Sequence, residues 1–455
     1  MTSLLVAGGW LVDEQRVRRA DVLVRDGKVA ALVEPAQSSP EADTLLDATG
    51  LHVLPGLVDA HVHFNQPGRT EWEGYQTGGA AAAAGGVTCV LDMPLNCHPP
   101  TLDRDALLTK HAAIAEHALV DYALWGGVVP DSLDHLPELR DAGVVGVKAF
   151  LCDSGLAEYP PLDQARLELA MRRTAQLGLL LALHAEDAEL TGRLGADARA
   201  AGRNEPLDWA RSRPSEAEME AVARALDIAS VTGARLHFVH ISTGAAAQRI
   251  AEARRAGLDV SLETCPHYLT LDERDLERLG AVAKCAPPLR SAEVAESLWR
   301  ALLRGDVDWV ASDHSPCPPD MKEGDIWQAW GGISGVQTTL PVLLDEAVHR
   351  RGLPLPRLVC LTAANPARRF GLYPRKGALV PGSDADLTLV DLESEWILGQ
   401  ADLHTRWPVS PFIGRTFRGR VEATLVRGTT VYRHGEVLAQ PGFGRLLVSS
   451  GVVAG

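Results

Sequence analysis

The chain has 455 residues, of which 46% are hydrophobic and 23% charged, with 42 glycines and 28 prolines. A chain of this length and composition can bury one large core or two ordinary ones, which excludes a disordered, collagen-like or coiled-coil protein. The 44 lysines and arginines against 59 aspartates and glutamates give a net charge of −15. We therefore expect no nucleic-acid partner.

Neither export nor membrane insertion is predicted. The first residues lack a basic segment followed by a long apolar run and a small-residue cleavage site, and no stretch of about 18 apolar residues occurs. The seven scattered cysteines form no CxxC pair and are expected to be reduced thiols. These features predict a soluble cytoplasmic protein with no membrane partner.

Short β-like runs occur at both ends of the chain. They are separated by turn signals such as Gly-Gly, Asp-Gly and Arg-Gly. The runs cover residues 3–6, 19–24, 29–33, 386–390, 423–426 and 430–432. We expect residues 1–55 and 371–455 to meet in space and to form one small β domain.

The middle of the chain, residues 56–370, alternates apolar strand-like runs with helical runs rich in Ala, Leu, Arg and Glu. Eight strands are expected at 56–63, 87–92, 122–126, 146–150, 179–184, 235–240, 259–264 and 308–313. Helices are expected between them, for example at 164–176, 216–232, 244–256 and 294–303. This rhythm predicts an α/β fold with a (β/α)8 barrel.

Polar side chains stand at the ends of several predicted barrel strands. His61 and His63 are two residues apart on one strand, so their side chains share a face and can hold one ion. His184 and His240 end two further strands, and Asp313 ends the eighth. A lone barrel histidine is more often a core residue, but the ends of parallel strands meet on one rim. The set therefore predicts a metal centre.

Lys148 lies in an otherwise apolar strand of a chain with only six lysines. Burying an ammonium group costs several kcal/mol unless it is paired, and burial lowers its pKa. A salt bridge is one explanation. The other is a neutral amine that adds CO2 and becomes a carbamate bridging two ions.

Two divalent ions balance the charge of a carbamate, Asp313 and a bridging hydroxide better than one ion does. Six ligands also exceed the tetrahedral demand of a single zinc ion. Zinc suits these ligands, and so do iron, cobalt, nickel and manganese. His237 and His314 adjoin predicted ligands and are expected to support the structure or the ligands. His267 could support a ligand or face the substrate.

The segment Pro55–His63, with Lys148, His184, His240 and Ser312–His314, closely resembles the cyclic amidohydrolases of the amidohydrolase superfamily. Within that group, further segments are similar to the allantoinases, namely residues 67–75, 92–96, 263–268, 312–318 and 330–335. The resemblance covers essentially the whole chain. It implies a metal-dependent barrel with a small β-sandwich from both chain ends, and a homo-oligomer, commonly a tetramer.

The resemblance also implies the roles of the ligands. His61 and His63 would hold the more buried ion, and His184 and His240 the more exposed one. Carbamylated Lys148 would bridge the two ions. Asp313 would be both a ligand and the catalytic base. The implied reaction is hydrolysis of the hydantoin ring amide of allantoin, which yields allantoate.

Substrate contacts are expected from loops on the same rim of the barrel. Gly332 and Ser334 lie in a glycine-rich loop whose backbone can approach a flat ring closely, unless the loop is an ordinary tight turn. The family resemblance adds Asn96 and Cys285 as candidates. Three tryptophans near this rim form a lid or wall, or simply pack: Trp72, Trp327 and Trp330.

Three alternatives remain at this point. Dihydroorotases carry an arginine two residues after the second histidine, where it clamps a carboxylate, but this chain has Asn65, and Arg69 could replace that arginine in part. Dihydropyrimidinases and hydantoinases share the ligands but generally lack the run at residues 71–75. A non-enzymatic interaction protein with this fold would lack ligands, and here every ligand type is present.

Overall fold

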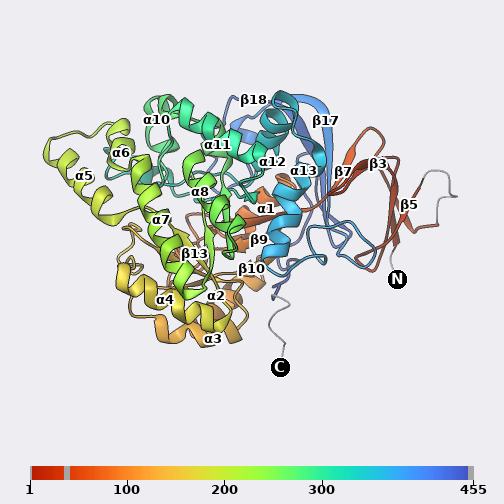
Figure 1. The fold of residues 1–455 in the computed structure, drawn as a ribbon. Coiled ribbons are helices and arrows are strands. Elements are labelled where there is room, and N and C mark those ends of the chain that lie inside the picture. The colour runs from red at the N-terminus through yellow and green to blue at the C-terminus, as the bar shows by residue number, and fades with distance from the viewer. Residues whose placement is uncertain (1–2, 35–40, 449–455) are drawn as a thin grey trace.

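The structure is a computed structural model that describes residues 3–34 and 41–448. In this part of the chain, a barrel of parallel strands lies beside a smaller β-structure made from both chain ends (Figure 1). None of the described helices combines the length and the apolar composition needed to cross a bilayer.

The barrel wall consists of eight strand positions, each paired in parallel with the next. The strands are β8 (Leu57–Val62), β9 (Val87–Asp92), β10 (Asp121–Leu124) continued by β11 (Gly126–Gly127), β12 (Val147–Phe150), β13 (Leu180–His184), β14 (Arg235–Phe238), β15 (Val260–Thr264) and β16 (Trp309–Val310). A parallel bridge between Val62 and His314 joins the first strand position to the last. The predicted (β/α)8 barrel is therefore confirmed.

Helices surround the barrel (Figure 1). The longer ones are α1 (Tyr75–Ala84), α2 (Arg104–Ala115), α4 (Gln164–Leu177), α5 (Ala188–Ala200), α7 (Ser215–Thr232), α8 (Gly244–Arg255) and α11 (Ala292–Arg304). Shorter ones are α3 (Leu136–Asp141), α6 (Pro206–Ser212), α9 (Pro266–Thr270), α10 (Glu273–Leu279), α12 (Thr339–Val342), α13 (Leu355–Val359) and α14 (Asn365–Arg369). Local sequence sets their ends: Asp163 caps the start of α4 by accepting a backbone N–H bond, and Gly178 ends it with a left-handed conformation.

The smaller part contains two sheets. One has the order β5-β4-β1-β6, and the other has the order β20-β19-β18-β17-β7-β2-β3. The N-terminal strands are β1 (Ser3–Ala7), β2 (Trp10–Val12), β3 (Val17–Arg19), β4 (Asp21–Arg25), β5 (Lys28–Val33), β6 (Thr44–Asp47) and β7 (His52–Pro55), and the C-terminal ones are β17 (Leu387–Ile397), β18 (Thr416–Val426), β19 (Thr429–Arg433) and β20 (Glu436–Val437). One hydrophobic cluster includes Val22 from the first sheet and Leu11, Leu387 and Leu425 from the second, as in a β-sandwich.

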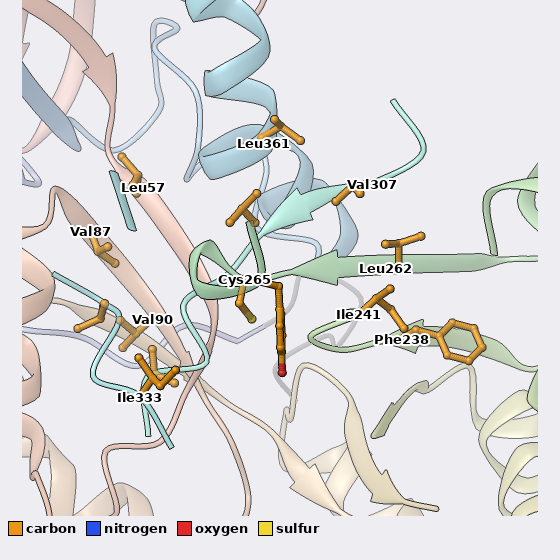
Figure 2. Packing of buried hydrophobic residues seen from close by; sticks show 14 of the residues in the cluster. Leu57, Val87, Val90, Phe238, Ile241, Leu262, Cys265, Val307, Ile333 and Leu361 are labelled. Atoms are coloured by element: carbon orange, nitrogen blue, oxygen red, sulfur yellow. The ribbon is translucent and has the colours of Figure 1, made fainter. Parts of the chain in front are cut away.

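The largest hydrophobic cluster lies between the barrel strands and the helices outside them. Figure 2 shows Leu57 and Val87 from neighbouring strands in this cluster, with Leu262 from β15 and Leu361 from a helical segment. Fully burying one such side chain contributes roughly 1.5–3 kcal/mol. This packing fixes the strands whose ends carry the polar residues described below.

A buried ionic cluster connects the barrel to the β-sandwich. The Nζ atom of Lys376 lies 2.5 Å from Asp121 on β10, 2.7 Å from Asp386 and 3.0 Å from Asp384, both just before β17. The Lys376 side chain is fully buried. Arg427, which follows β18, also pairs with Asp121. The cluster therefore holds segments of both parts together.

We expect Lys376→Met to lower the free energy of unfolding by about 3–5 kcal/mol, because it leaves buried carboxylates without their central cation. Urea unfolding would measure the change. Lys28→Met is a matched control, since Lys28 lies 2.5 Å from the same Asp384 but its side chain is 47% exposed. The control is expected to cost at most about 1 kcal/mol, and equal losses for the two variants would contradict the prediction.

Candidate metal centre and active site

A cavity of about 450 Å³ opens at the rim formed by the carboxyl ends of the barrel strands. This volume is typical of small-molecule sites. The six predicted ligands all line it: His61, His63, Lys148, His184, His240 and Asp313.

The first group of ligand atoms comes from the ends of β8 and β16. The two Nε2 atoms of His61 and His63 lie 3.3 Å apart, and Asp313 Oδ1 lies 3.1 Å and 3.4 Å from them. His61 donates from Nδ1 to Glu263 across 2.5 Å, so its Nε2 atom keeps a free lone pair. His63 turns Nδ1 toward the Leu95 carbonyl at 3.4 Å. Lone pairs and a carboxylate aimed at one point repel each other, and a divalent cation would relieve that repulsion.

The second group comes from the ends of β13 and β14. His184 Nδ1 lies 3.1 Å from His240 Nε2, and His184 donates from Nε2 to Glu186 across 2.7 Å. The Nδ1 atom of His240 is buried without a partner among the described residues. Burial lowers the pKa of both histidines, which keeps the rings neutral, as metal ligation requires. The donor set therefore fits a second cation.

Lys148, on β12, is 1% exposed. Its Nζ atom lies 5.2 Å from the centre of the Phe150 ring and makes no ion pair with any described residue. Burial lowers the pKa of Lys148 to about 8, so a useful fraction of the amine is neutral near pH 7. The described residues do not supply the salt bridge that would otherwise explain a buried lysine.

Asp313 is ionised in these surroundings. Burial alone would raise its pKa, but the neighbouring His61 and His63 hold the pKa at about 2. Its backbone has φ = +46°, and that of His240 has φ = +40°. Such left-handed conformations are uncommon for residues other than glycine and often occur at functional sites.

Two buried carboxylates, Glu263 and Glu186, contact the histidines from behind. The sequence did not single out either of them as a functional residue. Glu263, at the end of β15, accepts from His61 and, across 2.8 Å, from Trp309 Nε1, and lies 3.2 Å from His237. Glu186 accepts from His184. These contacts fix the imidazole tautomers. Glu263 could have been found, because it is a strand-end carboxylate on the same rim as Asp313.

The predicted supporting residues lie in different places. His314 accepts from the Gly335 backbone N–H at 3.2 Å, and its Nε2 atom lies 3.4 Å from Glu73. His237 lies 3.0 Å from Ser261 through Nδ1. His267 is buried, its Nε2 atom has no partner among the described residues, and it does not line the cavity.

Three of the four predicted substrate-binding residues line the cavity: Asn96, Cys285 and Gly332. Ser334 lies outside its wall. The Cys285 carbonyl already accepts from Trp209 Nε1 across 3.0 Å, and Gly332 donates to the Lys284 carbonyl across 2.7 Å. The backbone groups of Cys285 and Gly332 therefore position the loops as well as facing the cavity.

Trp327 and Trp330 line the cavity, whereas Trp72 packs edge-on against Trp330 with 5.0 Å between ring centres. Asn65 is buried outside the wall, and Arg69 pairs with Glu158 at 2.7 Å, also outside it. Neither Asn65 nor Arg69 is placed to clamp a substrate carboxylate.

Gly332→Ala is expected to displace the loop that ends the cavity and to raise KM roughly tenfold or more. A Cβ atom at Gly332 would lie 2.1 Å from the Ser315 carbonyl oxygen, at φ = +127°. Steady-state kinetics would measure the change. At Gly331 a Cβ atom would find its nearest neighbour at 3.8 Å, so Gly331→Ala should change KM little, and equal effects would refute the steric argument.

Comparisons with known proteins identify the family of the chain. A model described as the amidohydrolase family matches residues 52–431, and the chain belongs to that family. An allantoinase of Rubrobacter xylanophilus is 49% identical over 96% of this chain and 96% of the relative. An allantoinase of Deinococcus radiodurans is 50% identical over 98% of each chain.

Among solved structures, the L-hydantoinase (dihydropyrimidinase) from Arthrobacter aurescens matches with a TM-score of 0.95 at 36% identity, covering 98% of this chain and 100% of that one. The predicted enzyme class, a cyclic amidohydrolase similar to the allantoinases, is confirmed by these relatives. The family is metal-dependent, and the described residues include groups able to bind a metal ion.

Proposed function

We propose that this enzyme hydrolyses the hydantoin ring amide of allantoin to allantoate. The observation that carries the proposal is the convergence of two groups of ligand atoms and Lys148 on one cavity wall, in a chain about half identical to allantoinases along nearly its whole length. The substrate is a small cyclic amide, and the cavity has the volume for one.

The proposed cofactors are two divalent ions. His61, His63 and Asp313 would hold one ion, and His184 and His240 the other. Lys148 would take up CO2, lose a proton and become a carbamate between the two. Zinc is the first choice because it suits nitrogen and carboxylate ligands, and iron, cobalt, nickel and manganese suit them too.

Bound divalent ions lower the pKa of water and polarise a carbonyl group. Asp313 accepts a proton from the attacking water, which its low pKa allows because the carboxylate is ionised at neutral pH. As the new C–O bond forms and the ring C–N bond breaks, Asp313 passes that proton to the departing nitrogen. The remaining proton of the new carboxyl group goes to solvent.

Other residues orient these groups. Glu263 and Glu186 hold His61 and His184 in the tautomers that leave a lone pair facing the cavity. The loop with Gly332 and the side chain of Asn96 limit where a flat ring can lie.

The substrate is tested by measuring kcat/KM for allantoin, hydantoin, dihydrouracil and dihydroorotate, with metal analysis on the same sample. We expect a clear preference for allantoin and about two ions per chain. No preference for allantoin would favour the dihydropyrimidinase or hydantoinase alternative, and a preference for dihydroorotate would favour the dihydroorotase alternative. Fewer than one ion per chain after reconstitution, without turnover, would contradict the metal assignment.

The tetramer implied by the family resemblance stays a prediction. Light scattering combined with size-exclusion chromatography would measure the mass of the assembly in solution. A mass of about four chains is the expected result, and the mass of a single chain would contradict it.

A further inference from the structure

The cavity extends past the ligands along one face of α5. Ala188, Thr191, Gly192 and Gly195 line it, and their spacing places them on the same side of the helix. A Cβ atom built at Gly192 would meet no other atom within 4 Å. At Gly195 such an atom would lie 3.6 Å from Arg199 and 3.8 Å from Trp327. The open space on this face therefore lies at Gly192, on the helix that follows the strand of the ligand His184.

A buried arginine borders this space. Arg213 follows α6 and lines the cavity, and its side chain is 10% exposed. Its Nε atom lies 3.1 Å from each Glu186 carboxylate oxygen, and Nη2 donates to Glu186 across 2.5 Å and to Cys152 Sγ across 3.1 Å. Among the described residues, Nη1 has no partner. Nη1 is therefore the guanidinium nitrogen that is left to bind a ligand in the cavity, which Arg213 lines.

The position of this nitrogen is fixed from several sides. Glu186 is itself bonded to His184, so the guanidinium has a set place relative to a predicted ligand. The guanidinium carbon lies 5.0 Å from the centre of the Trp209 ring, and Arg290 donates to the Arg213 carbonyl. A donor held in this way needs little reorganisation to bind a ligand.

We propose that Arg213 and the α5 face form the subsite for the ureido arm of allantoin, with Arg213 Nη1 donating to the carbonyl oxygen of that arm. This inference rests on the proposed function. A single free nitrogen suits one carbonyl oxygen, whereas a carboxylate is best bound by two parallel N–H bonds, and Glu186 already occupies that edge of the guanidinium.

The arrangement accounts for selectivity between cyclic amides. A hydantoin without the arm leaves the Arg213 nitrogen unpaired in a mostly buried position, which costs binding energy. Sites built around a substrate hydrogen-bonding group reject analogues that lack it. Leu95 and Phe150 also line the cavity, and neither of these side chains carries a hydrogen-bond donor.

Arg213→Lys tests the hydrogen bond, because lysine keeps a positive charge beside Glu186 but loses the free guanidinium nitrogen. We expect kcat/KM for allantoin to fall at least tenfold, kcat/KM for hydantoin to stay within about threefold, and the metal content to stay unchanged. If kcat/KM falls equally for both substrates, or if metal is lost, Arg213 acts only by positioning His184, and the proposal is overturned. Arg224→Lys, at an arginine paired with Asp187 outside the cavity wall, is the control.

Gly192→Leu tests the space without touching Glu186 or His184. The new side chain would fill the subsite, so allantoin turnover should fall at least tenfold while hydantoin turnover changes little. The affinity for allantoate, which carries two ureido arms, should fall in parallel when measured by calorimetry on the holoenzyme. Asp197→Leu, at an exposed position of α5 that points away from the cavity-lining residues, should leave both measurements unchanged. Equal losses for the two substrates would overturn the subsite.

The substrate preference of the parent enzyme distinguishes failure of the proposed function from failure of the subsite alone. If it shows no preference for allantoin over hydantoin, the proposed function is wrong and the subsite with it. If the parent prefers allantoin and both the Arg213→Lys and Gly192→Leu variants keep that preference, the proposed function stands and the subsite is wrong.

Discussion

Asp313→Asn is expected to reduce kcat by about a thousandfold while the metal content stays close to that of the parent. Asparagine still presents an oxygen atom to a cation, but it cannot accept the proton of the attacking water. The effect is large because the parent carboxylate is fully ionised, its pKa being held at about 2 by His61 and His63 against the effect of burial. Steady-state kinetics and metal analysis on one sample measure both quantities.

Asp153→Asn is the matched control for that variant. Asp153 lines the same cavity but is exposed, and its carboxylate accepts from the Gly155 backbone N–H rather than contacting a histidine. Its kcat should stay within about twofold of the parent. Retention of more than a tenth of the parent kcat by Asp313→Asn would mean that another group accepts the proton.

Lys148→Ala is expected to lose most of the bound metal and, with it, at least about a thousandfold in kcat. The variant removes the amine whose carbamate we propose as the bridging ligand. A short-chain carboxylate such as acetate or propionate, added at millimolar concentration, should restore part of the metal content and activity by occupying the space. Metal analysis before and after the addition measures the effect.

Lys284→Ala is the control for Lys148→Ala. It shows whether the loss of metal is specific to the proposed carbamate or follows the removal of any lysine that lines the cavity. Burial lowers the pKa of Lys284 to about 8, as it does for Lys148, and Lys284 lines the same cavity. However, its Nζ atom donates to the Ala329 carbonyl across 2.5 Å, away from the histidines. This variant should keep its metal. If Lys148→Ala were as active as the parent without supplement, the carbamate proposal would be wrong.

The barrel could be predicted because its strands are nearly continuous apolar runs. Such runs can be recognised in the sequence even when the pairing of the strands is not known. The run at 87–92 coincides with β9. The sandwich was harder to predict. β7 was missed, and the expected run at 386–390 covers only the buried start of β17, whose outer half alternates polar and partly exposed residues. Whether a half-exposed segment of this kind forms a strand depends on pairing with segments that are distant in the sequence.

The ligand candidates could be predicted from residue type and position alone, because several histidines and an aspartate at the ends of barrel strands indicate a shared site. Arg213 could not be predicted in this way. It follows a short helix, and its role depends on meeting Glu186 and Cys152 in space. The same holds for Ser334, which the loop sequence placed near the substrate but which lies outside the cavity wall.

The sandwich built from both chain ends has a consequence for biosynthesis. Pro55 on β7 pairs with Leu387 on β17, so the first strands leave the ribosome long before their partners are made. Until then their open edges can pair wrongly with other chains. Nascent chains released before the last part is translated should therefore be prone to aggregation and dependent on chaperones.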